Sequence, residues 1–472
     1  MFRERFTALI GHGYFVPASL VSAALVRLLW ISFVHAPQAV DWLWYYQSAV
    51  SMANGHGYFF NGIPTAFWPV GYPGFLAGIF YLVGPHVFAG QIANIVECLG
   101  TILLTYHFIK KVFHSETAAR IAVLVLSFQP NNIAYTSLLT ADMFLTLLLM
   151  LSAVLFVSAR GRWGFFILSG LLWGLATLTK PQAIVVPAIF LVAFRGEKQS
   201  ILKLGTILYL MVLAVVAPWI ARNYRVFGAP VLSTNGGITL LFGNNPYATG
   251  RTPVLGDLYD TLSLLGDLDP QDPRHQFDPK QLFDPRQLFD GREVARDDRA
   301  RHLALDYIRD HPARVVALWP RKFVVLYRSD VDGFYYTLGL KNDLGRETRV
   351  VYVGLKVIGE LYYLVVILLF AFSLPLVLWR GSAAYAIGLL VCSYFTLLSL
   401  VFIGDPRYHL ALMPWIAMYS GVGGAILIGK GGSLEKTSQL DNLADSSPRT
   451  AQPLASVLPW YLEEAFSDAF SH

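Results

Sequence analysis

Long apolar runs separated by short polar segments extend along most of the chain. About 20 consecutive apolar residues form a helix long enough to cross a bilayer. The runs that meet or approach this length lie at residues 14–34, 88–109, 121–137, 143–158, 164–179, 183–194, 204–221, 353–378, 384–403 and 408–428. The pattern therefore predicts an all-α polytopic membrane protein with roughly 10–11 transmembrane helices, the first of them retained rather than cleaved.

One further apolar run, "PVGYPGFLAGIFYLVG" at residues 69–84, is interrupted early by glycine and proline. Cytoplasmic ends of membrane helices collect lysine and arginine, whereas translocated ends avoid them. With the N-terminus in the cytoplasm, every basic cluster outside the long loop lies inside only if this run does not cross. We therefore expect a re-entrant or interfacial helix here, within a first outer loop at residues 35–87.

The same charge rule divides the chain into four parts. They are a transmembrane catalytic module at 1–221, an outer-face loop domain at 222–350, C-terminal transmembrane helices at 351–429, and a weakly structured cytoplasmic tail at 430–472. The outer loop contains a repeated hexapeptide, "FDPKQLFDPRQLFDGRE" at residues 277–293. So short a low-complexity repeat is typical of an insertion rather than of a catalytic element.

Composition agrees with this membrane architecture and excludes several functions. The 472 residues are 55% hydrophobic and only 14% charged, and the mean hydropathy is +0.50. The formal net charge of +5 is carried at the ends of apolar runs, so no basic patch predicts a nucleic-acid partner. Cys98 and Cys392 both lie inside apolar runs, which excludes a disulfide framework and a cysteine metal site. No P-loop, dinucleotide fingerprint or G-x-S-x-G motif is present.

Two aspartates at predicted helix starts are candidates for catalysis. Asp41, in "AVDWLWYYQSA", follows the first span with no basic residue near it in the sequence, and Tyr45 shares its helical face. A carboxylate placed in this way can act as a general base. The alternative is an interfacial aspartate that caps a helix beginning at Trp42. Asp142, in "LTADMFLTLLL", is by residue type an N-cap, as is Thr140, but the charge rule places it on the same membrane face as Asp41.

Three cations are predicted on the outer face, where the charge rule disfavours them. They are Lys180 of "LTKPQ", Arg222 of "IARNYRVFG" and Arg407 of "GDPRYHLALMP". An anionic ligand such as a phosphate would account for them, although Lys180 can also snorkel and Asp405 can be the only partner of Arg407. "STNGGITLLFGNNPYATG", at residues 233–250, either approaches a polar ligand closely or forms ordinary turns.

Two classes of protein fit these residues. A membrane enzyme would collect paired carboxylates and phosphate-binding cations at one face and take a lipid-borne substrate from the bilayer. A secondary transporter, or a flippase for a lipid-linked sugar, would bury ionisable groups near mid-membrane in helices related by an internal repeat. Glu97 and Glu360 are the clearest intramembrane acids, and they do not recur in matching halves. The enzyme is therefore the leading hypothesis.

Across most of residues 10–428, the sequence resembles the GT-C membrane glycosyltransferases. Within them it is similar to bacterial family 39 proteins, protein mannosyltransferases and aminoarabinose transferases. The segments that carry this resemblance are "DWLWYYQSA", "GHGYF", "FWPVGYPGFLAGIF", "LTADMFLTLLL", "LTKPQ", "IARNYRVFG", "TNGGITLLFGNNPYATG" and "GDPRYHLALMP". Residues 251–350 have no counterpart in the family, and Lys180 stands where many relatives carry arginine.

The resemblance implies a GT-C fold with interfacial helices in the first outer loop, and an inverting transfer of a hexosyl or pentosyl group. The donor would be a sugar on a polyprenyl phosphate, and the acceptor a glycan, a lipid or a protein. The implied location is the bacterial inner membrane, with the active site on the periplasmic face and membrane lipids around it.

The resemblance also assigns roles to individual residues. Asp41 would be the general base, and Asp142 would orient the acceptor or a cation. The donor phosphate would be held by Lys180, Arg222, Arg407 and His409. The substrates would be contacted by Tyr45, His56, Tyr72, Asn235, Asn244, Asn245 and Tyr408. No cofactor is firmly implied: the two aspartates could hold Mg²⁺ or Mn²⁺, but the cations favour a metal-free site.

The topology can be tested directly. A reporter fused after Lys110 should read as cytoplasmic, because residues 69–84 are expected not to cross the membrane. An outer-face signal from that fusion would show that they do cross, and would place Asp142 and Lys180 on the other side.

Overall fold

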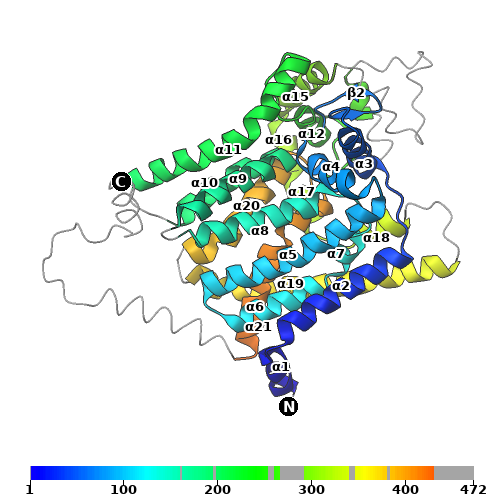
Figure 1. Ribbon diagram of the computed structural model, residues 1–472. Coiled ribbons are helices and arrows are strands. Elements are labelled where there is room, and N and C mark those ends of the chain that lie inside the picture. The colour runs from blue at the N-terminus through cyan, green and yellow to red at the C-terminus, as the bar shows by residue number, and fades with distance from the viewer. Residues whose placement is uncertain are drawn as a thin grey trace, which may run out of the picture.

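The computed structural model describes residues 2–159, 162–194, 198–253, 260–265, 292–339, 346–379 and 383–429. Most of the hexapeptide repeat and the whole tail lie outside these residues. Helices make up nearly all of the regular structure (Figure 1). The main bundle consists of α2 (Phe15–Phe33), α5 (Val87–Phe113), α6 (Glu116–Ser127), α8 (Ala141–Val157), α9 (Trp163–Thr179), α10 (Val186–Ala193), α11 (Lys198–Phe227), α19 (Arg346–Trp379), α20 (Ala383–Val401) and α21 (Met413–Leu427).

Shorter elements lie at the ends of this bundle. They are α1 (Phe2–Gly11), α3 (Val40–Ala53), the hairpin of β1 (Phe59–Phe60) and β2 (Ile63–Pro64), α4 (Gly71–Val83), α7 (Pro130–Tyr135), the 3₁₀ helix η1 (Pro181–Val185), α12 (Gly236–Gly243), α15 (Glu293–Asp310), α16 (Pro312–Ala317), α17 (Trp319–Tyr327), α18 (Asp332–Phe334), the π-helix η4 (Tyr335–Gly339) and the 3₁₀ helix η5 (Pro406–Leu412).

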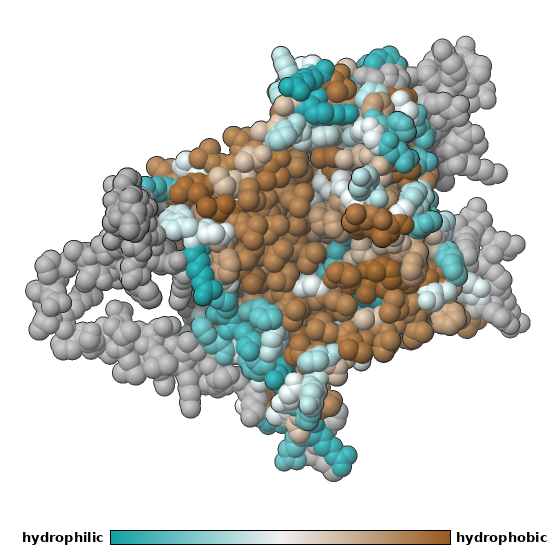
Figure 2. Space-filling view, viewed as in Figure 1, coloured by the Kyte–Doolittle hydropathy of each residue, from teal (hydrophilic) through white to brown (hydrophobic). Residues whose placement is uncertain are grey.

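The structure confirms a multi-pass membrane protein. Six described helices are long and apolar enough to cross a bilayer, and four shorter apolar helices accompany them. Figure 2 shows hydrophobic residues covering the middle of the face turned to the viewer, while hydrophilic residues gather near α1 and around α3 and α15. α4 has 13 residues and is therefore about 20 Å long, shorter than the ~30 Å hydrocarbon core. That length is compatible with the expected interfacial helix.

α21 is the central helix of the bundle. Apart from its last two residues it is buried on all sides, between α6 and α19. Small residues permit this close approach: a Cβ on Gly421 would meet the carbonyl oxygen of Ala118 in α6, and one on Gly423 would meet that of Leu369 in α19. Close packing through small residues is a principal stabilising contact between helices in lipid, where burial of apolar surface drives no association.

The single span predicted at residues 121–137 is wrong, because two helices occupy this stretch. α6 ends at Ser127, and α7 begins at Pro130, whose ring keeps the preceding Gln129 extended. The buried Arg27 of α2 stabilises the break. Its guanidinium donates to the carbonyl oxygens of Leu126 and Ser127 at 3.2 and 2.8 Å, and so satisfies the C-terminus of α6.

The two ends of the bundle differ in character. At one end, Arg120 donates to the carbonyl oxygen of Ile10, and Arg3 donates to that of Ile428 after α21. This end also holds Lys110, near the C-terminus of α5. The opposite end collects the starts of α5 and α8, the ends of α2 and α9, and the η5 segment before α21. The candidate site lies at this second end.

Two buried acids of α15 fasten the loop segments at the second end. Glu293 accepts hydrogen bonds from the Thr65 hydroxyl and the Ala66 amide of the first loop, at 2.9 and 2.5 Å. Asp297 accepts from the amides of Gly237 and Ile238 at the start of α12, at 2.6 and 3.2 Å. Burial raises the pKa of both carboxyl groups. The helices α12 and α15 are thereby held against the loop that follows α2.

The predicted boundary at residue 221 falls within α11, which continues to Phe227. Arg222 therefore belongs to the last turns of a long helix rather than to the loop that follows.

Gly421→Val should lower the melting temperature sharply, because the new side chain would overlap the α6 backbone. Such overpacking typically costs about 1–3 kcal/mol. The matched control is Gly354→Val in α19, where a Cβ would have no atom within 4 Å. Thermal unfolding in detergent distinguishes the two, and equal melting temperatures would contradict the assigned packing.

Candidate active site

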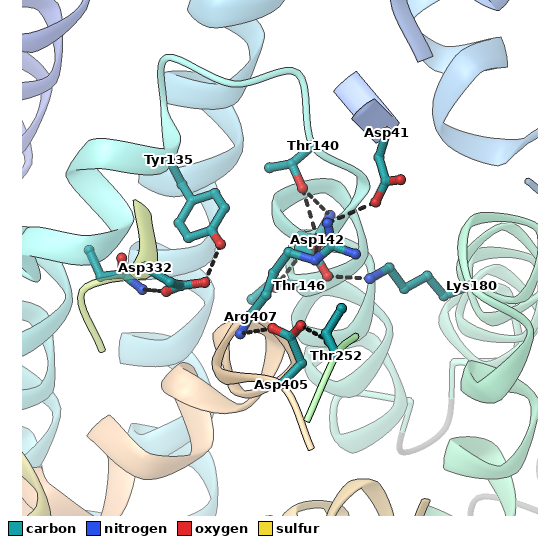
Figure 3. Close-up of polar contacts among 11 residues, drawn as sticks. Asp41, Tyr135, Thr140, Asp142, Thr146, Lys180, Thr252, Asp332, Asp405 and Arg407 are labelled. Carbon is teal, nitrogen blue, oxygen red and sulfur yellow. Dashed lines mark hydrogen bonds and ion pairs between the residues drawn. The ribbon is translucent and has the colours of Figure 1, made fainter. Parts of the chain in front are cut away.

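Asp41 and Arg407 form an ion pair that joins distant parts of the chain. Arg407 Nη1 lies 2.8 Å from Asp41 Oδ2, and both side chains are largely buried (Figure 3). Asp41 lies in the first turn of α3, whose N-cap is Ala39, with no side-chain capping bond. The capping role considered for Asp41 is thus excluded. The basic partner that the local sequence lacks comes from η5.

Asp142 forms the second half of the cluster, in the first turn of α8. Lys180, directly after α9, makes an ion pair with Asp142 Oδ1. The Thr140 hydroxyl donates to Asp142 Oδ2 at 2.9 Å, and Thr140 is also the N-cap of α8. Arg407 Nε lies 3.7 Å from Asp142 Oδ2. One cluster therefore brings together two acidic and two basic side chains from four separate segments. Its members are Asp41, Asp142, Lys180 and Arg407 (Figure 3).

The η5 segment presents Arg407 to this cluster. Asp405 caps η5, because its carboxylate accepts from the Arg407 backbone amide at 2.9 Å, and it also accepts from the Thr252 hydroxyl. Arg251 and Gly404 form a parallel bridge beside it. Asp405 therefore orients the backbone of Arg407 and leaves the guanidinium to Asp41. The suggestion that Asp405 is the only partner of Arg407 is wrong.

Aromatic side chains surround the cluster. The ring of Tyr408 lies 5.7 Å from Lys180 Nζ and 5.9 Å from the guanidinium carbon of Arg407, within the range of a cation–π interaction. Tyr45 is buried one turn after Asp41 and packs edge-on against the buried Tyr72, with ring centroids 5.3 Å apart. The Tyr72 hydroxyl donates to Asn94 at 3.4 Å. These rings exclude water from the back of the cluster.

Arg222 is occupied elsewhere. Its guanidinium donates to the carbonyl oxygens of Thr65 and Tyr58, at 2.8 and 3.0 Å, and to Asn223 Oδ1 at 2.9 Å. Within the described part of the chain, no hydrogen bond or ion pair links Arg222 to the Asp41–Asp142 cluster. Its visible contacts hold the first loop against α11.

The two histidines also lie outside the cluster. His409 is fully buried and contacts the carbonyl oxygen of Leu326 and the carboxylate of Asp330. His56 lines an open pocket of about 580 Å³ beside α3 and the β-hairpin, together with Gln47 and Asn54. Neither histidine contacts a residue of the cluster among the contacts described.

The three asparagines mostly support local backbone. Asn235 is the residue before α12. Asn244 donates to the carbonyl oxygens of Leu240 and Val401, at 2.9 and 2.8 Å, and Asn245 donates to that of Leu241 at 2.7 Å. The stretch therefore does not consist of ordinary turns: its centre is the helix α12, and Asn244 and Asn245 bond to carbonyl oxygens in the last turn of that helix.

Sequence reasoning missed a polar network beside the cluster. Asp332 of α18 accepts hydrogen bonds from the Tyr135 hydroxyl at 2.5 Å and from Asn131 at 2.9 Å (Figure 3). Asp330 accepts from Asn131 and from Gln129 of the α6–α7 break. The only signal for it in the sequence was the pair of acids in "RSDVDGF", and no local pattern identifies their partners 200 residues away.

No group of three or more histidine, cysteine or acidic side chains in the described residues is arranged to hold a metal ion. Asp41 and Asp142 are each already paired with a cation.

Comparison with known proteins gives the fold independently. Residues 68–221, about a third of the chain, match the family model for dolichyl-phosphate-mannose-protein mannosyltransferase. No curated protein matches the sequence. The apo structure of the oligosaccharyltransferase of Archaeoglobus fulgidus is 14% identical and matches over 97% of this chain and 54% of its own, with a TM-score of 0.51.

Two ligand-bound structures also match. The oligosaccharyltransferase AglB of the same organism, with an inhibitory peptide and a dolichol-phosphate, gives 14% identity, the same coverages and a TM-score of 0.50. ArnT from Cupriavidus metallidurans, bound to undecaprenyl phosphate, gives 14% identity, coverages of 96% and 85%, and a TM-score of 0.42.

The fold is therefore that of the GT-C membrane glycosyltransferases, as the sequence resemblance predicted. Within that class, the mannosyltransferase model covers the segment from the end of the first loop to the end of the α11 span, which includes Asp142 and Lys180. The chain spans about half the length of the archaeal oligosaccharyltransferase it matches.

The network beside the cluster predicts a specific pH dependence. Burial raises the pKa of Asp332 from 3.8 to about 6. Folding therefore favours its protonated form, and the stability that this form contributes is present below pH 4 and is lost as the pH rises through 6. The Asp332→Asn variant has no carboxyl group at this position, so its stability does not fall with this ionisation. Its melting temperature in detergent should rise relative to wild type between pH 4.5 and 7, and a constant difference would refute the shifted pKa.

Proposed function

We propose that the protein is an integral membrane glycosyltransferase that takes a sugar from a polyprenyl-phosphate-linked donor and transfers it, with inversion, to an acceptor on the outer face. The observation that carries this proposal is the buried cluster of Asp41, Arg407, Asp142 and Lys180 at one end of a GT-C bundle. The family match and the dolichol-phosphate bound to a protein of the same fold support it.

Arg407 is suited to bind the donor phosphate. Its buried Nε has no hydrogen-bond partner in the structure, and Asp142 Oδ2 lies 3.7 Å from it. A buried, unused guanidinium donor is costly unless a ligand supplies an acceptor. Phosphate oxygens accept such bonds in bidentate fashion, and Lys180 adds a second positive charge at the same place. As the sugar–phosphate bond breaks, both cations stabilise the charge that develops on the leaving phosphate.

Asp41 is suited to be the general base. In the structure its Oδ2 faces Arg407. A phosphate bound to Arg407 competes for this guanidinium and loosens the pair, so that Asp41 becomes free to take the proton of the acceptor hydroxyl. The acceptor oxygen then bonds to the anomeric carbon, and the phosphate leaves with the electron pair of the broken bond. The Asp142–Lys180 pair keeps the second cation in place during this exchange.

We assign the remaining contacts with the substrates from the positions of the residues around the cluster. Tyr45, Tyr72 and Tyr408 line the cluster and would contact the sugar or the lipid head. The exposed apolar end of α4, with Tyr81 and Leu82, offers surface to a polyprenyl chain, whose many carbons contribute binding energy without chemistry.

The proposed setting is the bacterial inner membrane with the cluster on the periplasmic side, since the basic Lys110 end of the bundle then faces the cytoplasm.

Asp41→Asn should reduce transfer about a hundredfold or more, because a general base contributes roughly 10²–10⁴-fold to rate. The assay is sugar transfer from membranes that contain polyprenyl-phosphate donors, with protein level and melting temperature measured in parallel. Asp306→Asn, an exposed acid on α15, is the control and should retain full activity. Normal turnover by Asp41→Asn would remove Asp41 from the base role.

One observation favours the transporter alternative. Glu97 of α5 is 2% exposed, and neither of its carboxyl oxygens has a hydrogen-bond partner. Buried ionisable groups in membrane helices often lie on ion pathways. Uptake of a soluble sugar into liposomes by wild type, lost in Glu97→Gln and unaffected by Asp41→Asn, would support this second function.

A further inference from the structure

His409 lies fully buried between two oxygen atoms. Its Nδ1 lies 2.7 Å from the carbonyl oxygen of Leu326, and its Nε2 lies 2.9 Å from Asp330 Oδ1. Both ring nitrogens therefore face hydrogen-bond acceptors, an environment that suits the imidazolium form, in which both nitrogens donate. The rings of Tyr363 and Tyr327 lie nearly parallel to the imidazole, with centroids 5.4 and 6.3 Å away. Aromatic faces favour a cation in this position.

Asp330 compensates that charge. It is 1% exposed, and its two oxygens accept from His409, from Asn131 at 2.6 Å and from Gln129 at 2.8 Å. A buried ion pair is tolerated only when further hydrogen bonds satisfy both partners, and this one meets that condition.

The His409–Asp330 pair links the segment that carries Arg407 to the segment that precedes Asp142. His409 is two residues after Arg407, in the same short 3₁₀ helix η5. Asn131 belongs to the first turn of α7, from which the chain continues to Asp142 at the start of α8. Asp330 lies between α17 and α18 of the outer segment. Three separate segments therefore meet at one buried charge, next to the cation that contacts Asp41.

We propose that His409 and Asp330 are positioning residues for Arg407: their buried ion pair fixes η5 so that the guanidinium reaches both Asp41 and a bound lipid phosphate. This inference rests on the proposed function, and it replaces the expectation that His409 itself binds phosphate. A 3₁₀ helix of seven residues has too few internal bonds to hold a buried arginine in place by itself. The ion pair supplies the missing constraint.

The test measures the affinity of the purified full-length chain for a polyprenyl phosphate. Asp330→Asn leaves the His409 charge without its partner, and we expect the dissociation constant to rise about tenfold. The same substitution in an Arg407→Lys background should have little further effect, because the guanidinium that the pair positions is then absent. A double-mutant cycle isolates this coupling.

The matched control is Asp332→Asn. Asp332 shares Asn131 with Asp330 and lies two residues away, but no hydrogen bond or ion pair among the contacts described joins it to His409. The Asp332→Asn variant should leave the dissociation constant for the polyprenyl phosphate unchanged. If the network had only a structural role, Asp330→Asn and Asp332→Asn would weaken binding equally. His409→Gln keeps a donor toward Asp330 and loses the charge, so it provides the same test if Asp330→Asn fails to fold.

The outcomes are distinguishable. Suppose that wild type binds a polyprenyl phosphate. If Asp330→Asn then weakens binding equally in both backgrounds, or in neither, the positioning role alone is overturned. Wild type that does not bind a polyprenyl phosphate overturns the proposed function, and this inference with it.

Discussion

The ion pair between Asp41 and Arg407 is the interaction on which the site depends. It joins residues 366 positions apart, one at the start of the first outer loop and one just before the last membrane helix. Both side chains are largely buried, so removing either one would leave the other as an uncompensated buried charge unless a ligand replaced it. Folding must therefore bring the first loop against η5 before the cluster can exist, and the surrounding tyrosines and the neighbouring Asp142–Lys180 pair are arranged around that contact.

The same constraint explains why the site lies at one end of the bundle. Helix ends provide first-turn and last-turn positions, and Asp41, Asp142, Lys180 and Arg407 all occupy such positions or the residues next to them. Side chains at these positions reach polar surroundings while the apolar stretches of the helices stay in lipid. A phosphate carried on a polyprenyl chain would meet the cations at this boundary, with its hydrocarbon chain left in the bilayer.

Much of the fold could be predicted from the sequence, because the signal is local: seven of the ten predicted spans are single α-helices near the predicted positions, and two, at 183–194 and 408–428, are a 3₁₀ helix that continues into an α-helix. The exception, residues 121–137, depends on Pro130 and on Arg27, which lies about a hundred residues earlier. Charge placement included the four cluster residues among its candidates, since each is an ionisable residue at the predicted outer face, but it did not separate them from the other candidates there. Their pairing could not be predicted, because Arg407 reaches Asp41 only in three dimensions. Arg222 and His409 satisfied the same charge argument, yet neither contacts the cluster among the contacts described. Arg222 donates hydrogen bonds to backbone carbonyl oxygens, and His409 contacts Asp330.

Mass spectrometry of the lipids that co-purify with the protein tests whether this cluster binds the donor phosphate. We expect wild type to carry a polyprenyl phosphate or its glycosylated form, Arg407→Ala to lose it and Arg222→Ala to retain it, because Arg407 belongs to the cluster and Arg222 does not. Bulk phospholipid alone in wild type, or a polyprenyl phosphate retained equally by Arg407→Ala, would contradict the assignment of this cluster as the site that binds the donor phosphate.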